Sequence, residues 1–464
     1  MKRNLEQLKN NVITLRFGVI FFCLDKVLFR TDRHITFNNI FYFFKYSITN
    51  SRKKGGIIIH TEKIRQLARS MRDEMIEMRR YLHRHPELSY QEHETADFIQ
   101  KKLREYGIPY RSEIAGTGIL GIIKGKHEGR TVALRADMDA LPIQEENDHS
   151  YVSVHEGVMH ACGHDAHMAM LLGAAKILKN LQDEIYGTVL LVFQPAEEKS
   201  PVGGAIPMME AGVFEDFMPD VIYAQHVWPY LPAGQIGIRD REMLGASDNF
   251  KVILKGVGGH ASLPHLTTDP VVTAGFLIVS LQTIVSRSLD PRHPSVLTIG
   301  SIHGGTAHNV IGNTVTLEGS IRTFGEDTRK RIKERFYEIT TNVAEMYNNE
   351  VEIDYQEGYP ATVNTPRWAR LARRSAQNLF GKDATPMIEP AMASEDFSRF
   401  LEKIPGAYIF LGAQMENSEE QKGLHDPRFN INEEVLPMGA AFLAKVAIDT
   451  LNELKENTIR IWID

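Results

Sequence analysis

The chain has 464 residues, enough for two domains, and its 43% hydrophobic and 24% charged residues are typical of a globular protein. Its 53 basic and 59 acidic residues leave a formal net charge of −6, which excludes the basic surplus that binding to nucleic-acid phosphates requires. Only Cys23 and Cys162 are present, so a disulfide framework is excluded, and we expect a cytoplasmic protein with small-molecule partners.

Residues 1–57 mix basic and aromatic residues in a pattern that does not continue after them. Their longest uncharged apolar run, residues 17–24, is much shorter than the roughly 20 residues that cross a bilayer, and no small-residue cleavage site follows it. We therefore expect no stable membrane insertion and an extension that is not part of the working fold. A membrane-surface anchor and an ordered accessory segment are the alternatives.

Helix and strand patterns alternate from Thr61 onward. Apolar residues recur at spacings of three and four from Thr61 until His85, which precedes a proline, and a second amphipathic helix is predicted over 94–106. Such alternation predicts an α/β fold with a mixed, largely parallel sheet and helices on both faces. The next predicted elements are strands at 116–125, 130–137, 187–194 and 221–226, and helices after His164 and near 204–211.

The pattern changes between residues 246 and 359. Its order, βαββαβ, predicts an inserted ferredoxin-like α+β lid domain. The catalytic domain is thus predicted to comprise residues 58–245 and 360–464, and the lid to serve dimerisation as well. The elements predicted in and after the lid are strands at 249–256, 295–305, 313–324 and 350–356, helices at 269–287 and 326–348, then a strand at 406–414 and a helix over 434–453.

Residues of metal-binding type follow successive strands of the predicted large sheet. Open α/β sheets bind ligands at the carboxyl ends of their strands, so we expect these side chains to meet at one edge. Thiolate, imidazole and carboxylate together form a transition-metal ligand set. The residues are Asp137 and Asp139, Glu197 and Glu198, His226, His425, and Cys162 and His164 from "MHACGHDAHMA".

Each of these residues taken alone also has a structural explanation. Cys162 and His164 fit a buried cysteine and a helix-capping histidine as well as they fit a metal. Glu197 and Glu198 also fit an exposed acidic helix start, where carboxylates favour the helix dipole. Histidines at strand ends often bond only to backbone. The placement of all these residues after successive strands is what favours a metal centre.

Eight motifs in order between about Ile57 and Leu451 carry a family resemblance. They resemble the amidohydrolase branch of the dinuclear metallopeptidases, which contains aminoacylases, hippurate hydrolases and auxin-conjugate hydrolases. The resemblance implies a catalytic domain with two divalent metal ions and an inserted lid that supplies substrate-binding residues and a dimer contact. The motifs are "RADMDALPIQE", "MHACGHDAHMAMLLGAA", "VFQPAEE", "GGAIPMMEAGVFE", "HVWPYLPAGQIGIR", "GGHASLPH", "GGTAHNVI" and "SEDFSRF".

The resemblance also implies a role for each candidate residue. Glu197 becomes the general base, and His260 of the lid the donor to the developing oxyanion. Asn309 and Arg322 of the lid grip the substrate carboxylate, for which the guanidinium fork of arginine is suited. Asp137 and Glu395 support the metal shell from outside it. The implied metal ligands are Cys162, His164, Glu198, His226 and His425.

These implications predict an enzyme. We expect a homodimeric, metal-dependent amidohydrolase that cleaves N-acyl amino acids to a carboxylic acid and a free amino acid by metal-activated water. Zinc or manganese suits the ligands, and cobalt or nickel also fits them. A dipeptidase or carboxypeptidase on the same scaffold is the alternative. A catalytically silent binding protein, and a metal-free thiol hydrolase in which His164 and Asp165 activate Cys162, are hypotheses from other classes.

Overall fold

The computed structural model describes residues 61–417, 419 and 421–461, so the predictions for residues 1–57 lie outside it. Residues 61–70 form a helix that a turn at Met71 separates from α4 (Arg72–Arg84), and α5 (His93–Glu105) follows. The amphipathic pattern had predicted one continuous helix up to His85. In both segments the apolar residues at spacings of three and four are the buried ones.

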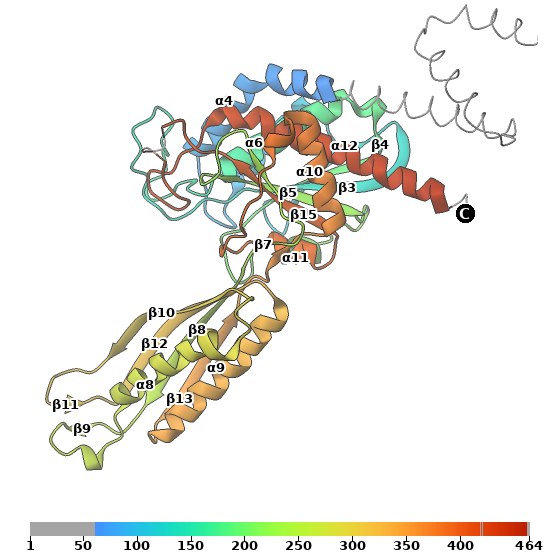
Figure 1. The fold of residues 1–464 in the computed structure, drawn as a ribbon. Coiled ribbons are helices and arrows are strands. Elements are labelled where there is room, and N and C mark those ends of the chain that lie inside the picture. Colours follow the sequence, from blue (N-terminus) through green and yellow to red (C-terminus); the bar gives the residue numbers. More distant parts are fainter. Residues whose placement is uncertain (1–60, 418, 420, 462–464) are drawn as a thin grey trace, which may run out of the picture. The chain divides into compact units, whose positions relative to one another are not determined.

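A seven-stranded mixed sheet, here called the large sheet, organises the main domain (Figure 1). Its four central strands, β4, β3, β5 and β15, are parallel to one another, and antiparallel strands form both edges. In spatial order the strands are β1 (Tyr110–Ile114), β2 (Gly118–Lys124), β4 (Tyr186–Gln194), β3 (His127–Asp137), β5 (Val221–Trp228), β15 (Gly406–Gly412) and β6 (Ile236–Gly237).

Helices cover both faces of the large sheet. Successive residues of β3 point to opposite faces, so Val132 and Leu134 join one apolar core while Ala133 joins another. The first core contains α4, α5, α6 (His164–Asn180), α10 (Pro366–Phe380) and α12 (Leu436–Ile461). The second contains the short helices α7 (Ala205–Glu210) and α11 (Phe397–Leu401). Burial on both faces explains why the central strands are apolar throughout.

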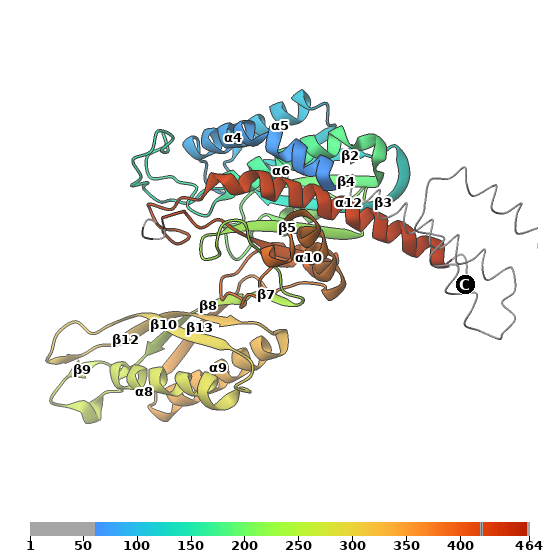
Figure 2. The ribbon, with the colours of Figure 1, turned by 45° about the horizontal axis from the view of Figure 1, so that its top comes forward.

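A separate four-stranded antiparallel sheet forms the lid, with α8 and α9 on one of its faces (Figure 2). The spatial order β10-β12-β8-β13 is that of a ferredoxin-like fold, and the predicted fold class is confirmed. The elements are β8 (Ala246–Lys255), α8 (Pro270–Thr283), β10 (Ser295–Gly304), β12 (Thr314–Thr323), α9 (Glu326–Met346) and β13 (Glu350–Glu357).

Two short ribbons complete the described part of the chain. β9 (Gly259–His260) pairs with β11 (Val310–Ile311), and β7 (Glu242–Leu244) pairs with β14 (Thr362–Val363). Within the described residues, one helical segment, Pro270–Ser288, is long and apolar enough to cross a membrane by length and composition. Its inner side packs into the lid core through Ala274, Leu277 and Leu281.

Candidate metal centre

The carboxyl ends of the parallel strands carry the donor residues, as the topology requires. β3 ends at Asp137, which pairs in register with Gln194 at the end of β4. Glu197 and Glu198 follow β4 after Pro195 and Ala196, and His226 lies near the end of β5. On the helical side, Cys162 precedes the first residue of α6, His164.

Six predicted residues meet at this edge. The Cys162 Sγ lies 3.4 Å from His226 Nε2, and His425 Nε2 lies 3.2 Å from Glu198 Oε1. Donor atoms lie within 4.8 Å of one another in three overlapping groups: Cys162 with His164 and His226, Cys162 with Glu198 and His425, and His164 with Glu197 and Glu198. Overlapping groups of this kind fit two neighbouring ions.

The chemistry of these side chains also fits bound cations. Thiolate, imidazole and carboxylate donors are those of zinc and related metals. His164 Nε2 and Glu198 Oε1 are both shielded from solvent, and neither makes a hydrogen bond. Unpartnered buried polar atoms are costly, and ligation to a cation removes that cost.

Electrostatics at the centre argue against a free thiolate nucleophile. Burial and the neighbouring Glu198 carboxylate raise the pKa of Cys162 well above its usual value, so the thiol keeps its proton unless a cation replaces it. The activating dyad of the thiol-hydrolase hypothesis is not formed either. His164 Nδ1 donates to the Asp139 carbonyl at 2.9 Å, and Asp165 binds His83 and Arg79 instead.

Two of the three histidines of the centre, His226 and His164, have pKa shifts of opposite direction. Burial and the adjacent His167 hold the pKa of His226 well below its usual value, which keeps its ring neutral and able to bind a metal. Burial opposes protonation of His164 too, but the charges of Asp137 and Asp139 outweigh it and raise the pKa of His164 to about 10. A cation at His164 Nε2 takes the place of that proton.

A strained turn presents Glu197. Ala196 has a left-handed φ of 56°, a conformation that costs a non-glycine residue about 1–2 kcal/mol. The turn is held by Glu92, whose Oε1 accepts from Ala196 N at 2.9 Å, and by Asp139, whose two oxygens accept from the backbone of Glu197 and Glu198 at 3.0 Å each. Burial and the nearby Glu395 carboxylate raise the pKa of Glu197 well above its usual value, as a general base requires.

Comparison with known proteins connects this geometry to a family. Residues 133–449 match the model of peptidase family M20/M25/M40. The chain belongs to the M20 peptidase family. It is 40% identical to N-acetyl-L-cysteine deacetylase of Bacillus subtilis over 84% of this chain and 91% of that protein. It is 41% identical to IAA-amino acid hydrolase ILR1-like 4 of Arabidopsis thaliana over 83% and 88% of the two chains.

A third M20 relative and a solved structure extend the comparison. Thermostable carboxypeptidase 1 of Saccharolobus solfataricus is 38% identical over 84% of this chain and 99% of that one. The crystal structure of the YxeP protein of Bacillus subtilis, a dinuclear metal binding peptidase from the M20 family, superposes with a TM-score of 0.72 at 33% identity, covering 83% and 99%. The present chain is thus a metal-dependent M20 hydrolase of the amidohydrolase branch, acting on amide bonds.

Asp137 and Glu395, the predicted supporting residues of this M20 chain, lie in a buried network behind the donors. Asp137 accepts from His167 Nδ1 and from Arg135, each at 2.6 Å, and Arg135 also binds Glu395 at 2.9 Å. His167 Nε2 in turn accepts from the backbone N–H of Val227 at 3.0 Å, next to His226. Asp137 also forms a donor group with His164 and His167, whose ligand atoms lie within 4.8 Å of one another.

Sequence reasoning named Asp139 among the residues of metal-binding type but gave it no specific role, and it gave none to His167, Glu92 or Arg135. Asp139 was noted only for its place after a strand, and His167 only as part of a quoted motif. The spacing of His167 three residues after His164 places both on one side of a helix, and this was the available signal. Glu92 comes from a distant segment that carries no local signal, whereas Arg135 is the first residue of the quoted motif "RADMDALPIQE". Their partners are known only once the chain has folded.

The predicted lid residues of the M20 fold do not meet in one place. His260 lies exposed on β9, and its Nδ1 pairs with the Ser262 hydroxyl at 2.7 Å. Asn309 is its neighbour, because its carbonyl accepts from Ala261 N at 3.1 Å. Arg322 lies near the end of β12 and donates to Ser394 of the main domain at 3.1 Å. β12 begins after the β9–β11 ribbon at Thr314, so 8 residues of strand, about 26 Å, separate Arg322 from that end of the lid.

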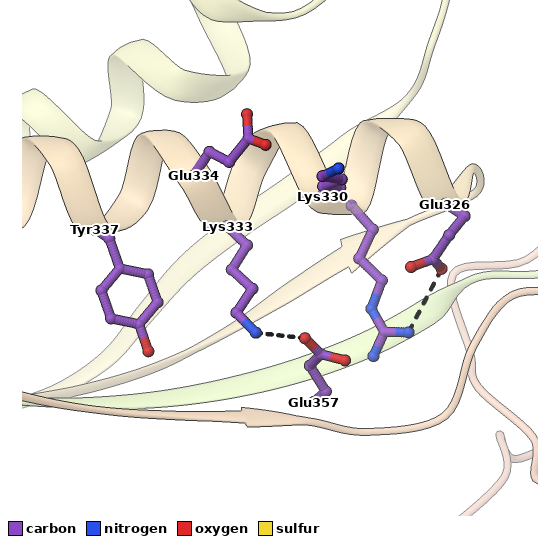
Figure 3. A pocket seen from close by; sticks show the side chains of 7 residues that line it. Glu326, Lys330, Lys333, Glu334, Tyr337 and Glu357 are labelled. Carbon is purple, nitrogen blue, oxygen red and sulfur yellow. Dashed lines mark hydrogen bonds and ion pairs between the residues drawn. The ribbon is translucent and has the colours of Figure 1, made fainter.

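The lid also carries a shallow surface pocket beside α9 (Figure 3). Lys333 bridges from α9 to Glu357 of β13 there, and Tyr337 lies one turn further along the helix. None of the predicted site residues lines this pocket. The donor cluster at the large sheet, and not this pocket, is therefore the candidate active centre of the M20 enzyme.

Proposed function

We propose that this M20 amidohydrolase cleaves N-acyl amino acids to a carboxylic acid and a free amino acid. The observation that carries the proposal is Glu197, a buried carboxylate with a raised pKa that lies within the donor cluster. The names of two relatives point the same way, since one is a deacetylase of N-acetyl-L-cysteine and another a hydrolase of IAA-amino acids. Cys162, His164, Glu198, His226 and His425 are the proposed ligands of two divalent ions.

Glu197 is the acid–base group in the proposed mechanism. Two divalent ions, when bound, lower the pKa of water and polarise the scissile carbonyl. Glu197 then accepts the proton of the attacking water and returns it to the leaving amine nitrogen. Its raised pKa suits both steps, because a carboxylate that is too acidic does not hold the proton long enough to deliver it. Asp139 and Glu92 keep the carboxylate in place by fixing the turn at Ala196.

Arg322 is proposed to recognise the carboxylate of the amino-acid product. Its Nη1 donates to Ser394, which precedes Glu395 in the loop beside the centre. Within the described residues, its other guanidinium N–H groups make no hydrogen bond or ion pair. A free fork of donors at this place fits a carboxylate, which it binds in a bidentate manner.

His260 and Asn309 are proposed to act on the active centre of a partner subunit. They lie beyond the far end of β12 from Arg322, so a single substrate does not reach all three within one chain. In a homodimer formed through the lids, His260 and Asn309 of one subunit lie close to the metal centre of the other. Val271, Val272, Phe276 and Val279 form an exposed apolar face on α8, and β10 is an edge strand beside it, which are surfaces that dimers bury.

The test is the release of free amine from a panel of N-acyl amino acids and dipeptides. The purified chain is reconstituted with zinc or manganese, and each reaction is repeated in chelator. We expect turnover that chelator abolishes, with acetyl, benzoyl or indoleacetyl amino acids preferred over dipeptides. Turnover that persists in chelator and stops on alkylation of Cys162 would favour the thiol mechanism and contradict the proposal.

A carboxypeptidase or dipeptidase activity is the second candidate. The relative from Saccharolobus solfataricus named as a carboxypeptidase favours it at 38% identity. A dipeptide is itself an acylated amino acid, so the same centre and the same Arg322 serve both reactions. The ranking of dipeptides against N-acyl amino acids in the panel decides between them.

A further inference from the structure

A second group of metal-binding atoms lies outside the metal centre. It comprises His83 of α4 with Glu145 and His149 of the loop between β3 and α6. Glu145 Oε1 lies 3.1 Å from His83 Nε2 and 3.3 Å from His149 Nε2. Donors that bind one tetrahedral zinc ion at about 2.0–2.1 Å lie about 3.3 Å from each other. The spacing of this group matches that around a zinc-class ion.

Asp165 fixes the orientation of the His83 ring. Its Oδ2 accepts from His83 Nδ1 at 2.8 Å and from Arg79 at 2.7 Å. Because His83 Nδ1 donates to Asp165, a neutral ring directs the lone pair of Nε2 toward Glu145. A carboxylate behind a histidine commonly orients metal-binding imidazoles in this way. His83 Nε2 and Glu145 Oε1, 3.1 Å apart, share either the second ring proton of a protonated His83 or a cation bound between them, and Glu145 Oε1 also accepts from Asn147 Nδ2 at 2.9 Å.

His149 completes the group and is held ready for a ligand. Its ring stacks on Tyr151 with centroids 3.7 Å apart. Both of its ring nitrogens are shielded from solvent, and neither makes a hydrogen bond. The side chains of His83, Glu145 and His149 are 0%, 2% and 16% exposed. The site is enclosed, and His149, the most exposed of the three side chains, is its contact with solvent.

We propose that His83, Glu145 and His149 bind a further divalent ion of the zinc class, in addition to the ions of the metal centre. Three protein ligands leave one tetrahedral position for water. The ion joins α4 to the loop, and Asp165 extends the link to the first turn of α6. Its role is structural, because that loop and that turn carry Cys162 and His164.

Metal content of three full-length proteins tests the site: wild type, His149→Phe and His155→Phe. Phenylalanine at position 149 keeps the stacking on Tyr151 and removes both nitrogens. His155 is a matched control in the same loop, since its Nδ1 bonds only the Pro86 carbonyl and it is outside the group. After saturation with zinc and dialysis, we expect His149→Phe to retain one ion per chain fewer than the other two.

Equal metal content in all three proteins would overturn the proposal. The count is a difference between variants, so it does not depend on how many ions the metal centre holds, and hydrolysis of N-acyl amino acids reports on the proposed function separately. Should His149→Phe fail to fold, anomalous scattering from wild-type crystals at the zinc edge decides. A peak among His83, Glu145 and His149 supports the site, and its absence from zinc-saturated crystals refutes it.

Discussion

Glu197 and Glu198 are adjacent in the chain but have different surroundings. Burial and the nearby carboxylates raise the pKa of Glu197, whereas Glu198 Oε1 lies 3.2 Å from His425 Nε2. Adjacent residues of one type can therefore serve as base and as ligand, because a sharp turn directs their side chains to different partners. The proposed roles, base for Glu197 and metal ligand for Glu198, are tested by substituting each residue separately.

Glu197→Gln is expected to lower kcat about 10²- to 10⁴-fold, since it removes the proton acceptor and preserves the shape of the side chain. Its metal content should equal that of wild type. The matched variant, Glu198→Gln, should lose metal as well as activity. Steady-state kinetics with elemental analysis of both proteins check this, and near wild-type kcat in Glu197→Gln would remove Glu197 from the mechanism.

Glu92 makes stability depend on pH. Burial and the charge of Asp139 raise its folded pKa to about 7, above the ordinary value of 4.5. The folded state therefore binds more protons than the unfolded state between pH 4.5 and 7, and stability falls as the pH rises through this window. Glu92→Gln keeps the hydrogen bonds to Ala196 and Thr117 without titrating.

The Glu92→Gln variant should accordingly gain stability over wild type as the pH rises from 5 to 8, by up to about 3 kcal/mol. Thermal melting of both proteins at pH 5 and pH 8 measures the difference. A melting-temperature difference that is the same at both pH values would show that Glu92 does not titrate in this window.

At the scale of elements, the turn after β4 depends on the loop after β3. Asp139 accepts from Glu197 N, Glu198 N and the Ser89 hydroxyl, so a single carboxylate joins the ends of two parallel strands to the segment after α4. Parallel strands end at the same edge, and this is what brings the residues after β3 and β4 within hydrogen-bonding distance. The geometry of Glu197 thus rests on a side chain 58 residues away.

Asp139→Asn should disturb this turn, because an amide turns one acceptor into a donor that faces a backbone N–H. We expect metal affinity to fall about 10- to 100-fold, the usual effect of losing a residue that supports a metal shell. Asp148→Asn, an exposed position in the same loop, should leave affinity unchanged. Competition with a fluorescent chelator measures both, and wild-type affinity in Asp139→Asn would contradict the expected role.

At the scale of the whole molecule, the lid separates groups that the proposed reaction needs together. Arg322 contacts the main domain, whereas His260 and Asn309 stand beyond the opposite end of β12. The apolar face of α8 is the surface proposed to bring a second subunit close. Phe276, 52% exposed, lies on this face.

Mixing two inactive variants tests the shared centre. Glu197→Gln and His260→Ala should each be nearly inactive, but a mixed dimer contains one centre with Glu197 from one subunit and His260 from the other. Equal mixing after subunit exchange should restore about a quarter of wild-type activity, since half of the dimers are mixed and half of their centres are complete. No recovery, from variants shown to exchange, would place His260 and Glu197 in the same chain.

Phe276→Asp should yield monomers by placing a charge in the proposed interface. Thr341→Asp, an exposed position on α9, should leave the assembly unchanged. Sedimentation velocity of wild type and both variants measures the outcome. A wild-type chain that sediments as a monomer at micromolar concentration would contradict the dimer.

The sequence by itself determined the fold class and the family. Alternating helices and strands with apolar central strands specify a largely parallel sheet covered on both faces, and this fold class was confirmed. The eight motifs and their order in the chain predicted the family, and the comparisons confirmed it. The polar strand β1 was missed, because the sequence "YRSEI" has neither the apolar run nor the alternation that marks a strand.

Only the tertiary structure decided which polar side chains are partners. Asp165 follows His164 in the chain but binds His83, 82 residues away, and Glu92 supports a turn 104 residues away. The tertiary structure also placed His260 and Asn309 far from Arg322, although all three residues lie in the predicted lid domain. The reason is physical: burial patterns are local and repeat along the chain, whereas a hydrogen bond depends on where two distant segments come to lie after folding.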